Sequence, residues 1–290
     1  MKIVKFLGGL GNQMFQLALL KSLQNLYPEE RILADIFSYN GYGLHNGFEV
    51  ADIFNLSVEF ATLKNVASVA WPFPNYRTWQ IGSRILPQRR SMCIDLKNTD
   101  WDNPKYKYYE GYWQNEKFFK SIRPSLLDVF SFPLDDNIHN NKLLNDLTNT
   151  SSISIHIRRG DYIGNKLYQN ICTSEYYRNA IEFVTSQLQA VEIACIFSND
   201  MEWCKKNIPV LLPSGVDIRY VDWNTGINSF QDIHLMSKCN HNIIANSSFS
   251  WWGAWLNQNP NKIVVTPNKW TNNTIGENPI CDSWNRVKIN

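Results

Sequence analysis

Arg158 and Arg159 are the two adjacent side chains of this sequence that are best suited to hold a charged ligand. They stand in the run HIRRGDY, at the end of the apolar segment Ser152–Ile157, which has the length of a buried strand. Neighbouring side chains of an extended backbone point to opposite sides, so one arginine can face a ligand while the other pairs with Asp161. A guanidinium group binds two phosphate oxygens at once, which suits it to a diphosphate. A solvated surface pair braced by Asp161 is the alternative.

A second candidate for anion binding is the run NSSFSWWGAWL, which follows the apolar segment Asn242–Ala245. Ser247, Ser248 and Ser250 occupy the place where a helix must begin. The first amides of a helix are unsatisfied and carry positive partial charge, so a phosphate there would meet free N–H groups and hydroxyls. Simple N-capping by Ser248 or Ser250 is the alternative. We expect the three tryptophans that follow to pack this helix into the core.

Two acidic residues have comparable positions near other predicted strands. Ser198 and Asp200 follow the apolar run Glu192–Phe197, and Asp200 precedes a short helix that it is suited to cap. This segment also lies on the expected ligand-binding rim, so both residues are substrate-binding candidates. Asp232 opens the run DIHLMSKCNH, where its carboxylate could accept the N1–H and exocyclic N–H donors of a guanine ring. A first-turn acid is also favoured for its charge alone.

Other motifs in the sequence are weaker. GGLGNQ at the N-terminus lacks the third glycine of a dinucleotide loop and the Lys-Ser/Thr of a P-loop, although it lets the backbone approach a ligand closely. Asp100 and Asp102 form a DxD triplet of the kind that binds a metal in some sugar transferases, but no buried strand leads into it, so we expect no metal site. The six cysteines form no CxxC pair, which predicts reduced thiols rather than a disulfide framework or a zinc site.

Composition limits the class of protein. The chain has 290 residues, 44% of them hydrophobic and 19% charged, with a formal net charge of +2. This composition supplies a packed core and excludes a disordered chain, and the charge is too small for a general nucleic-acid binder. The N-terminal apolar stretch is soon broken by Gly, Asn and Gln, and no run of about 18 apolar residues occurs. We therefore expect neither a signal peptide nor a membrane anchor, and a cytoplasmic protein.

The elements that must position these residues alternate between strand and helix. Lys2–Leu7 predicts a strand, Met14–Tyr27 a helix after the GGLGNQ turn, and Arg31–Ile36 a second strand. The second half repeats this pattern, with predicted strands at Ser152–Ile157, Glu192–Phe197, Ile218–Val221, Asn242–Ala245 and Lys262–Thr266 and helices at Ser174–Gln189, Met201–Asn207, Ser229–Cys239 and Phe249–Gln258. The pattern predicts an α/β fold in which ligands bind beyond the carboxyl ends of parallel strands.

The predicted domains are residues 1–150, on the acceptor side, and residues 151–290, which bind the nucleotide sugar. Ser131–Thr150 is polar and rich in asparagine, which indicates a linker. Gly41–Asn103 contains several prolines and aromatic residues and is expected to be irregular.

Five strings, taken together and in this order, resemble glycosyltransferase family 11, the α-1,2-fucosyltransferases: GGLGNQMFQ, HNGFEV, GYWQNEKFF, HIRRGDY and DIHLMSKCNHNIIANSSFSWWGAWL. The resemblance implies a GT-B-like fold, with two Rossmann-like domains and a cleft between them. It also implies an inverting, metal-independent transfer of L-fucose from GDP-β-L-fucose to the 2-OH of a terminal β-galactosyl residue of a glycan. Because GGLGNQ stands near the start, without a membrane stem, the chain is similar to the bacterial enzymes, with O-antigen among the expected acceptors.

The expected partners are therefore GDP-fucose, as donor substrate, and a β-galactoside-terminated oligosaccharide. No cofactor, nucleic acid or integral membrane segment is expected, and a homo-oligomer is left open.

The same resemblance assigns roles to particular residues. Arg158 and Arg159 would hold the β-phosphate, and Asp232 would correspond to the acid that reads guanine. The remaining nucleotide-side candidates line the site or wrap the diphosphate: His156, Asn246, Ser247, Ser248 and Phe249. The acceptor-side candidates, of which the first two also reach the fucose, are Gly11, Asn12, His45 and Gln114.

One position departs from a wider relative's pattern. Some α-1,6 relatives carry a glutamate base ten residues beyond the motif histidine, where this chain has Lys166. The general base is therefore unassigned, and the candidates are Asp161 and His234. Arg158 and the helix end beyond Ser248 would stabilise the leaving diphosphate.

Two other functions remain open at this stage. Another GDP-sugar transferase, O-fucosyl or GDP-mannose-dependent, would use the same arginines. A non-catalytic carbohydrate-binding protein with a tryptophan-lined cleft would leave the paired arginines unexplained.

Overall fold

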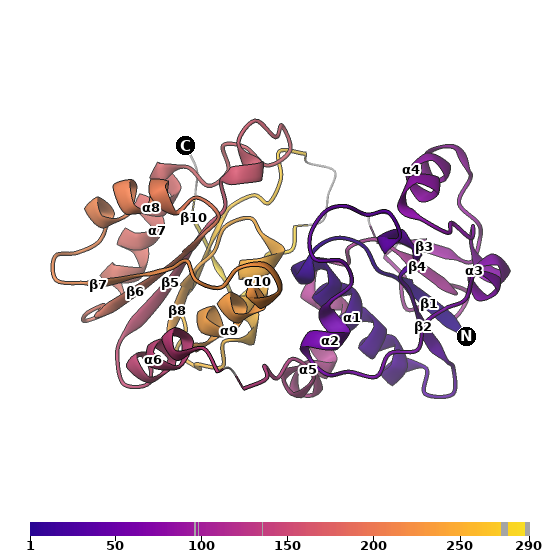
Figure 1. Cartoon of the computed structure of the whole chain (residues 1–290), viewed down its shortest axis with the longest axis horizontal. Coiled ribbons are helices and arrows are strands. Elements are labelled where there is room, and N and C mark those ends of the chain that lie inside the picture. Colours follow the sequence, from indigo (N-terminus) through magenta and orange to yellow (C-terminus); the bar gives the residue numbers. More distant parts are fainter. Residues whose placement is uncertain (96, 98, 135, 274–277, 288–290) are drawn as a thin grey trace. The chain divides into compact units, whose positions relative to one another are not determined.

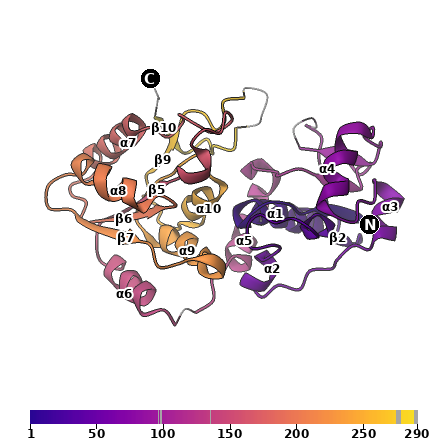
Figure 2. The same ribbon diagram turned by 45° about the horizontal axis from the view of Figure 1, so that its top comes forward.

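The computed structural model describes residues 1–95, 97, 99–134, 136–273 and 278–287. The chain divides into two compact units, Met1–Pro133 and Leu134–Asn290, and each is an α/β domain built on a parallel sheet (Figures 1 and 2). The predicted fold class, two Rossmann-like domains, is confirmed. The second unit begins at Leu134 rather than at residue 151.

The first unit contains a parallel sheet in the order β2-β1-β4-β3 within its described residues. Its strands are β1 (Lys2–Lys5), β2 (Ile32–Asp35), β3 (Met92–Ile94) and β4 (Tyr108–Glu110). Its helices are α1 (Leu10–Leu26), α2 (Val50–Ile53), α3 (Leu63–Val69), α4 (Tyr76–Ile85) and α5 (Arg123–Val129), with 3-10 turns at Phe37–Tyr39, Glu116–Phe118 and Lys120–Ile122. Every residue of β1 and β2 is buried, as their apolar runs predict.

The expectation that Gly41–Asn103 is irregular was wrong, because this segment supplies α2, α3, α4 and β3. Two helix starts carry ordinary caps: Thr62 forms a capping box with Asn65, and the side chain of Asn75 accepts a hydrogen bond from the Thr78 amide at 2.9 Å. The prolines of the segment lie between these elements and do not interrupt them.

Helix α1 begins at Leu10, four residues before the predicted start at Met14. GGLGNQ is therefore only partly a turn, since Gly11 and Asn12 already belong to the first turn of the helix. Gly8 has φ +95°, a conformation that favours glycine, and Gly9 is the N-cap. This tight connection brings the start of α1 directly onto the carboxyl end of β1.

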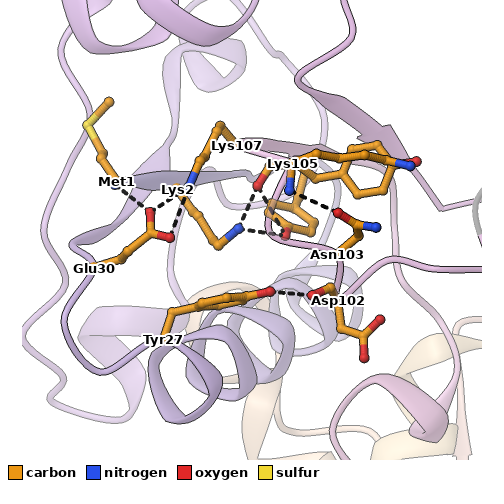
Figure 3. A network of polar contacts seen from close by, with 10 residues as sticks. Met1, Lys2, Tyr27, Glu30, Asp102, Asn103, Lys105 and Lys107 are labelled. Atoms are coloured by element: carbon orange, nitrogen blue, oxygen red, sulfur yellow. Dashed lines mark hydrogen bonds and ion pairs between the residues drawn. The ribbon is translucent and has the colours of Figure 1, made fainter.

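Figure 3 shows a polar network at the opposite end of β1. The Lys2 side chain is fully buried and donates a hydrogen bond to the Tyr106 carbonyl at 2.6 Å. Burial, with a smaller contribution from Lys107, lowers the pKa of Lys2 to about 8. The Glu30 carboxylate forms ion pairs with the Met1 ammonium group at 2.6 Å and with the Lys107 side chain at 2.9 Å. These contacts fix the N-terminal strand to the loops on either side of it.

The second unit contains a longer parallel sheet, in the order β10-β9-β8-β5-β6-β7 within its described residues. Its strands are β5 (Ser152–Ile157), β6 (Ile193–Ser198), β7 (Asp217–Val221), β8 (His241–Ile243), β9 (Val264–Pro267) and β10 (Asn285–Val287). Its helices are α6 (Ile138–Leu147), α7 (Ser174–Ser186), α8 (Met201–Asn207), α9 (Phe230–Lys238) and α10 (Ser248–Leu256). Read from β7, the strands of this unit run third, second, first, fourth, fifth, sixth, which is the doubly wound order.

The sheet of the second unit separates two apolar layers. Ala194 and Ile196 of β6 belong to the cluster that includes α7 and α8, whereas Cys195 and Phe197 face the cluster that includes α6 and α9. The alternation follows from the two-residue period of a strand. The tryptophans of α10 are buried as predicted.

The predicted linker Ser131–Thr150 was wrong over half of its length, because α6 occupies Ile138–Leu147. Its leucines Leu143 and Leu147 pack with Leu235 of α9, and Asn137 caps the helix. The prediction failed because the many polar residues of this segment outnumber the few leucines that form the buried apolar side of α6. None of the helices in the described ranges combines the length and the apolar character needed to cross a bilayer.

Candidate active site

Strand order places the candidate residues of the second unit at its topological switch point. Strands β5 and β8 are neighbours in the sheet, with Ile153 opposite His241 and Ile155 opposite Ile243. The chain after β5 leads to α7 on one face, and the chain after β8 leads to α10. In open α/β sheets the crevice between two such diverging connections is where ligands bind.

Arg158 follows the last residue of β5 and lies at this crevice. Its Nε lies 2.8 Å from Asp161 Oδ1, and its second guanidinium nitrogen donates to Asp161 Oδ2 at 2.9 Å. The guanidinium also lies 5.6 Å from the ring centre of Tyr162. The Arg158 side chain remains 29% exposed, so the donors that Asp161 does not use can reach a ligand.

Arg159 turns to the other side, toward β6 and α8. It pairs with Asp200 at 3.2 Å and stacks over the Trp203 ring at 4.4 Å, while its amide donates to Asn199 Oδ1 at 2.9 Å. Asp200 also caps α8, as predicted, by accepting from the Trp203 amide. The opposite orientation of the two arginines was expected, but both of them are paired with a carboxylate.

His156 is the buried side chain that most clearly lacks a partner near the crevice. It is 5% exposed, its Nδ1 has no hydrogen-bond partner among the residues that the structure describes, and its ring lies 6.1 Å from that of Phe249 in α10. Burial and the nearby Arg158 lower its pKa to about 3, so the imidazole is neutral at physiological pH. A buried polar atom without a partner is costly, which favours a role for Nδ1 in contact with a ligand.

Helix α10 begins beside the same arginine. Ser247 is its N-cap and accepts from the Phe249 amide at 3.4 Å. The alternative in which Ser248 or Ser250 caps the helix was wrong, because the helix already includes Ser248 and the Ser250 hydroxyl bonds to backbone carbonyls inside the fold.

Tyr162 contacts both Arg158 and the segment directly before α10. Its ring lies under Arg158, and its hydroxyl donates to the backbone carbonyl of Asn246 at 3.1 Å. Asn246 is buried, and its side chain is used internally, donating to the Trp270 carbonyl and accepting from Cys172. The positive end of α10 and the Arg158 guanidinium are therefore brought to the same crevice.

Asp232 lies in the first turn of α9, as predicted, in an environment that disfavours its charge. Burial raises its pKa to about 7, although a hydrogen bond from Asn224 at 2.9 Å acts in the opposite direction. Asn224 is itself held by Asn140 of α6 at 2.9 Å. A carboxylate kept partly protonated near pH 7 is characteristic of functional sites.

The acceptor-side candidates lie together at the switch point of the first unit. Strands β1 and β4 are neighbours there, and Gln114, after β4, donates to Asn12 Oδ1 of α1 at 2.6 Å. His45 has φ +62° and lies against Gly9, where an added Cβ would come within 3.0 Å of its Nδ1. Gly11 is in the same first turn of α1.

The two candidate bases differ in environment. Burial raises the pKa of Asp161, but the hydrogen bonds and charge of Arg158 outweigh it, and the pKa lies below its usual range. Asp161 is thus a weak base. His234 Nδ1 lies 3.3 Å from Gln231 Oε1 on α9.

The residues of the described ranges contain no cluster of three or more His, Cys, Asp or Glu side chains arranged to bind a metal. Of the DxD pair, Asp100 binds Lys105 at 2.9 Å.

Sequence reasoning missed several residues that hold the candidates in place: Gln13, Tyr162, Asn199 and Asn224. Gln13 is the residue after the candidate Asn12, and it is fully buried and bonds to four backbone groups. The available signal for the role of Gln13 was its uncharged amide side chain, close to the start of a helix that begins after a glycine. The role of Asn224 depends on partners distant in the sequence, which no local pattern reveals.

Comparison with known proteins agrees with the motif strings. The family model described as Glycosyl transferase family 11 matches residues 1–287. The chain belongs to glycosyl transferase family 11. It is 31% identical to an Escherichia coli protein named alpha-1,2-colitosyltransferase, with 99% of this chain and 98% of that protein covered. It is 22% identical to mouse galactoside alpha-(1,2)-fucosyltransferase 2, with 87% of this chain and 67% of that protein covered.

One solved structure supports the fold of this family 11 glycosyltransferase. The fucosyltransferase NodZ from Bradyrhizobium aligns with a TM-score of 0.50 at 12% identity, over 87% of this chain and 90% of NodZ. The alignment agrees with the assignment of two Rossmann-like domains.

Proposed function

We propose that this glycosyltransferase is an inverting galactoside α-1,2-fucosyltransferase that uses GDP-β-L-fucose as donor and needs neither a metal nor a cofactor. The observation that carries the proposal is the crevice of the second unit, where Arg158, the start of α10 and the unpartnered Nδ1 of His156 meet beside the switch point. Its donors suit a diphosphate, and Asp232, in the first turn of α9 of the same unit, suits guanine. The family's mouse relative is named for this linkage and acceptor.

In the proposed reaction the 2-hydroxyl oxygen of the β-galactosyl acceptor bonds to C1 of fucose from the face opposite the diphosphate. The bond between C1 and the β-phosphate oxygen breaks, and its electron pair leaves with GDP. The hydroxyl proton passes to a base or to water. This course converts the β-linked donor into an α-linked product.

The protein's contribution is to stabilise charge on the departing diphosphate. Arg158 is oriented in advance by Asp161, and the α10 amides are fixed by the fold, so neither must reorganise when charge develops. Loss of one such contact costs roughly 3 kcal/mol, or about a hundredfold in rate. In this scheme Arg159, held by Asp200 and Trp203, also contacts phosphate from the β6 side.

A strong base is not required in this scheme, because an oxocarbenium-like sugar makes even a weakly activated hydroxyl an adequate nucleophile. Asp161 and His234 remain the groups proposed to receive the proton. Asp161 is the weaker candidate, since Arg158 stabilises it as the anion and lowers its pKa.

The direct test is to incubate the purified protein with GDP-fucose and a panel of β-galactosides, with and without EDTA, and to locate the new linkage by NMR. We expect an α-1,2-linked fucosyl product whose rate of formation is unchanged by EDTA. A product with another linkage, or turnover abolished by EDTA and restored by a divalent cation, would refute the proposal.

A colitosyl donor is the second candidate, favoured by the 31% identity to the colitosyltransferase. Colitose is L-fucose without its 3-hydroxyl. A site that hydrogen-bonds this hydroxyl rejects the deoxy sugar by roughly four orders of magnitude, whereas an apolar pocket separates the two sugars far less. The ratio of kcat/KM for GDP-fucose and GDP-colitose decides between the two donors.

A further inference from the structure

Helix α4 of the first unit is attached to the domain by one face only. Its Tyr76 ring packs on Tyr42 at 4.8 Å, and its Trp79 donates to Glu110 at 2.5 Å while Lys5 lies over the Trp79 ring. Gly82 lies against Phe73, where an added Cβ would come within 2.1 Å of the ring. In both overall views α4 lies at the periphery of its unit (Figures 1 and 2).

The opposite face of α4 carries large apolar side chains into solvent. Ile81 is 56% exposed and Ile85 is 73% exposed, and Leu86, directly after the helix, is 38% exposed. At 3.6 residues per turn, Arg77 and Arg84 lie on the same side as these isoleucines and away from Tyr76 and Trp79. The outer face of α4, defined by Arg77, Ile81, Arg84 and Ile85, therefore carries apolar and basic side chains together, with Leu86 exposed directly after the helix.

The segment of sequence that contains α4 carries only basic charged residues. Residues 60–94 contain the five basic residues Lys64, Arg77, Arg84, Arg89 and Arg90 and no acidic residue, in a chain whose net charge is only +2. Arg89 is used within the fold, donating to the Ala67 and Ala70 carbonyls. Across the described ranges, Arg77, Arg84 and Arg90 form no ion pair with a carboxylate, unlike Arg31, Arg158, Arg159, Arg219 and Arg286.

We propose that the outer face of α4 docks this protein on an anionic lipid bilayer. A short helix with apolar side chains between arginines suits the boundary between headgroups and acyl chains, where the isoleucines enter the apolar layer and the arginines reach lipid phosphates. A cluster of basic residues without neighbouring acidic residues is attracted to anionic lipids. Moving exposed isoleucine side chains from water into an apolar layer lowers the free energy. The surface is peripheral, and no part of α4 spans the membrane.

Cosedimentation with vesicles tests this docking. The vesicles are made of phosphatidylcholine with or without about one-third phosphatidylglycerol. We expect the wild-type protein to sediment with the anionic vesicles and to remain in solution with pure phosphatidylcholine. Each arginine near such a surface is worth about fivefold in partitioning, so the triple variant Arg77→Gln, Arg84→Gln, Arg90→Gln should bind about a hundredfold more weakly. High salt should also release the protein, because the Debye length falls to about 3 Å at 1 M.

A matched control carries the same change of charge on the second unit: Arg178→Gln, Lys238→Gln, Lys269→Gln, all at exposed positions. It should bind like the wild type. The double variant Ile81→Ser, Ile85→Ser should lose binding at unchanged net charge, whereas Val210→Ser, Ile227→Ser, at similarly exposed apolar sites, should not. All four variants should keep the wild-type turnover with a water-soluble galactoside, which shows that they are folded.

Three results would overturn the proposal. They are a wild-type protein that does not sediment with anionic vesicles, equal weakening by both charge variants, and unchanged vesicle binding by the isoleucine variant. The last result, together with binding to soluble poly-glutamate, would instead indicate a general polyanion surface. None of these results depends on the identity of the donor sugar.

Discussion

Asp232→Asn is the substitution that most sharply separates a nucleotide-reading acid from a structural one. The wild-type carboxyl has a pKa of about 7 in the folded protein, because it is buried, against 3.8 for an ordinary aspartate. Above pH 7 the folded protein therefore carries a buried charge that is assisted only by the hydrogen bond from Asn224. Asparagine has the same shape, can accept the same hydrogen bond, and has no charge.

The magnitude follows from linkage. A pKa raised on folding contributes stability that is complete below about pH 4 and is lost as the pH rises through about 7. The difference between 3.8 and about 7 corresponds to at most about 4 kcal/mol, at 1.36 kcal/mol for each pH unit. We therefore expect Asp232→Asn to be more stable than the wild type at pH 8 by up to this amount. The advantage should shrink toward zero as the pH falls to about 4.

Binding should change in the opposite direction. The carboxylate is proposed to accept both the N1–H and the exocyclic N–H of guanine. The asparagine side chain has one acceptor, Oδ1, and one donor, the Nδ2 amide, so it can accept only one of these two hydrogen bonds. Charge-assisted hydrogen bonds of this kind contribute roughly 1.5–3 kcal/mol each, so GDP-fucose affinity should fall about a hundredfold. Chemical denaturation at pH 4 to 8 measures the first effect, and isothermal titration calorimetry at pH 8 measures the second.

Asp222→Asn is the matched control, since Asp222 lies on the same unit but is half exposed and pairs with Lys205 at 3.4 Å. Asp222→Asn should change neither the free energy of unfolding at pH 8 nor the affinity for GDP-fucose appreciably. If Asp232→Asn binds GDP-fucose like the wild type, Asp232 does not read guanine. If it also gains no stability at pH 8, burial does not raise the pKa of this carboxyl, and both parts of the reasoning fail.

Three further predictions address the rest of the site. Arg158→Ala should lower kcat about a hundredfold while Arg178→Ala leaves it unchanged; full turnover by Arg158→Ala would remove the diphosphate role. Wild-type affinity for GDP-fucose, measured by calorimetry, should fall about tenfold for each pH unit below 7, because the Asp232 carboxyl must then lose a proton to bind, and a flat profile would contradict this. Gln13→Ala should cost roughly 3 kcal/mol in denaturant unfolding, because it removes the hydrogen bonds to the Gly8 and Gly47 carbonyls and to the Glu49 and Val50 amides, although the Gly8 carbonyl keeps the Tyr39 hydroxyl as a donor; a loss within experimental error would show that water replaces the lost bonds.

Much of the second unit could be predicted from sequence. Ser152–Ile157 and Met201–Asn207 have the same bounds in the structure as in the sequence-based prediction. Both are bounded by strong local signals: a short apolar run in one case and the cap Asp200 in the other. The α/β class and the placement of candidates after strands follow from the same alternation of elements.

The first unit was less predictable, because its elements are short and depend on contacts made across the domain. Helix α4 buries only Gly82 and is otherwise half-buried or exposed, so its apolar residues do not form the single stripe that marks a core helix. Strand β3 is three residues long and is held by pairing with β4. Local sequence contains little of this information.

Within the candidate site, local roles were predictable and long-range ones were not. Asp200 as a cap and Asp232 as a first-turn acid follow from their position alone. The pairing of Arg159 with Asp200 and the link from Tyr162 to Asn246 join segments that are distant in sequence. The catalytic roles of these residues stay predictions that the proposed variants test.

The contact between Gly82 and Phe73 sets how closely α4 packs against the rest of its unit. Phe73 stands between Pro72 and Pro74, and its ring fills the space beside Gly82. A side chain at position 82 would therefore displace either the Phe73 ring or the helix, and a displaced helix would carry its isoleucines and arginines with it. If the outer face of α4 docks on a bilayer as proposed, a single methyl group there would weaken that docking without touching a residue proposed to bind sugar or nucleotide.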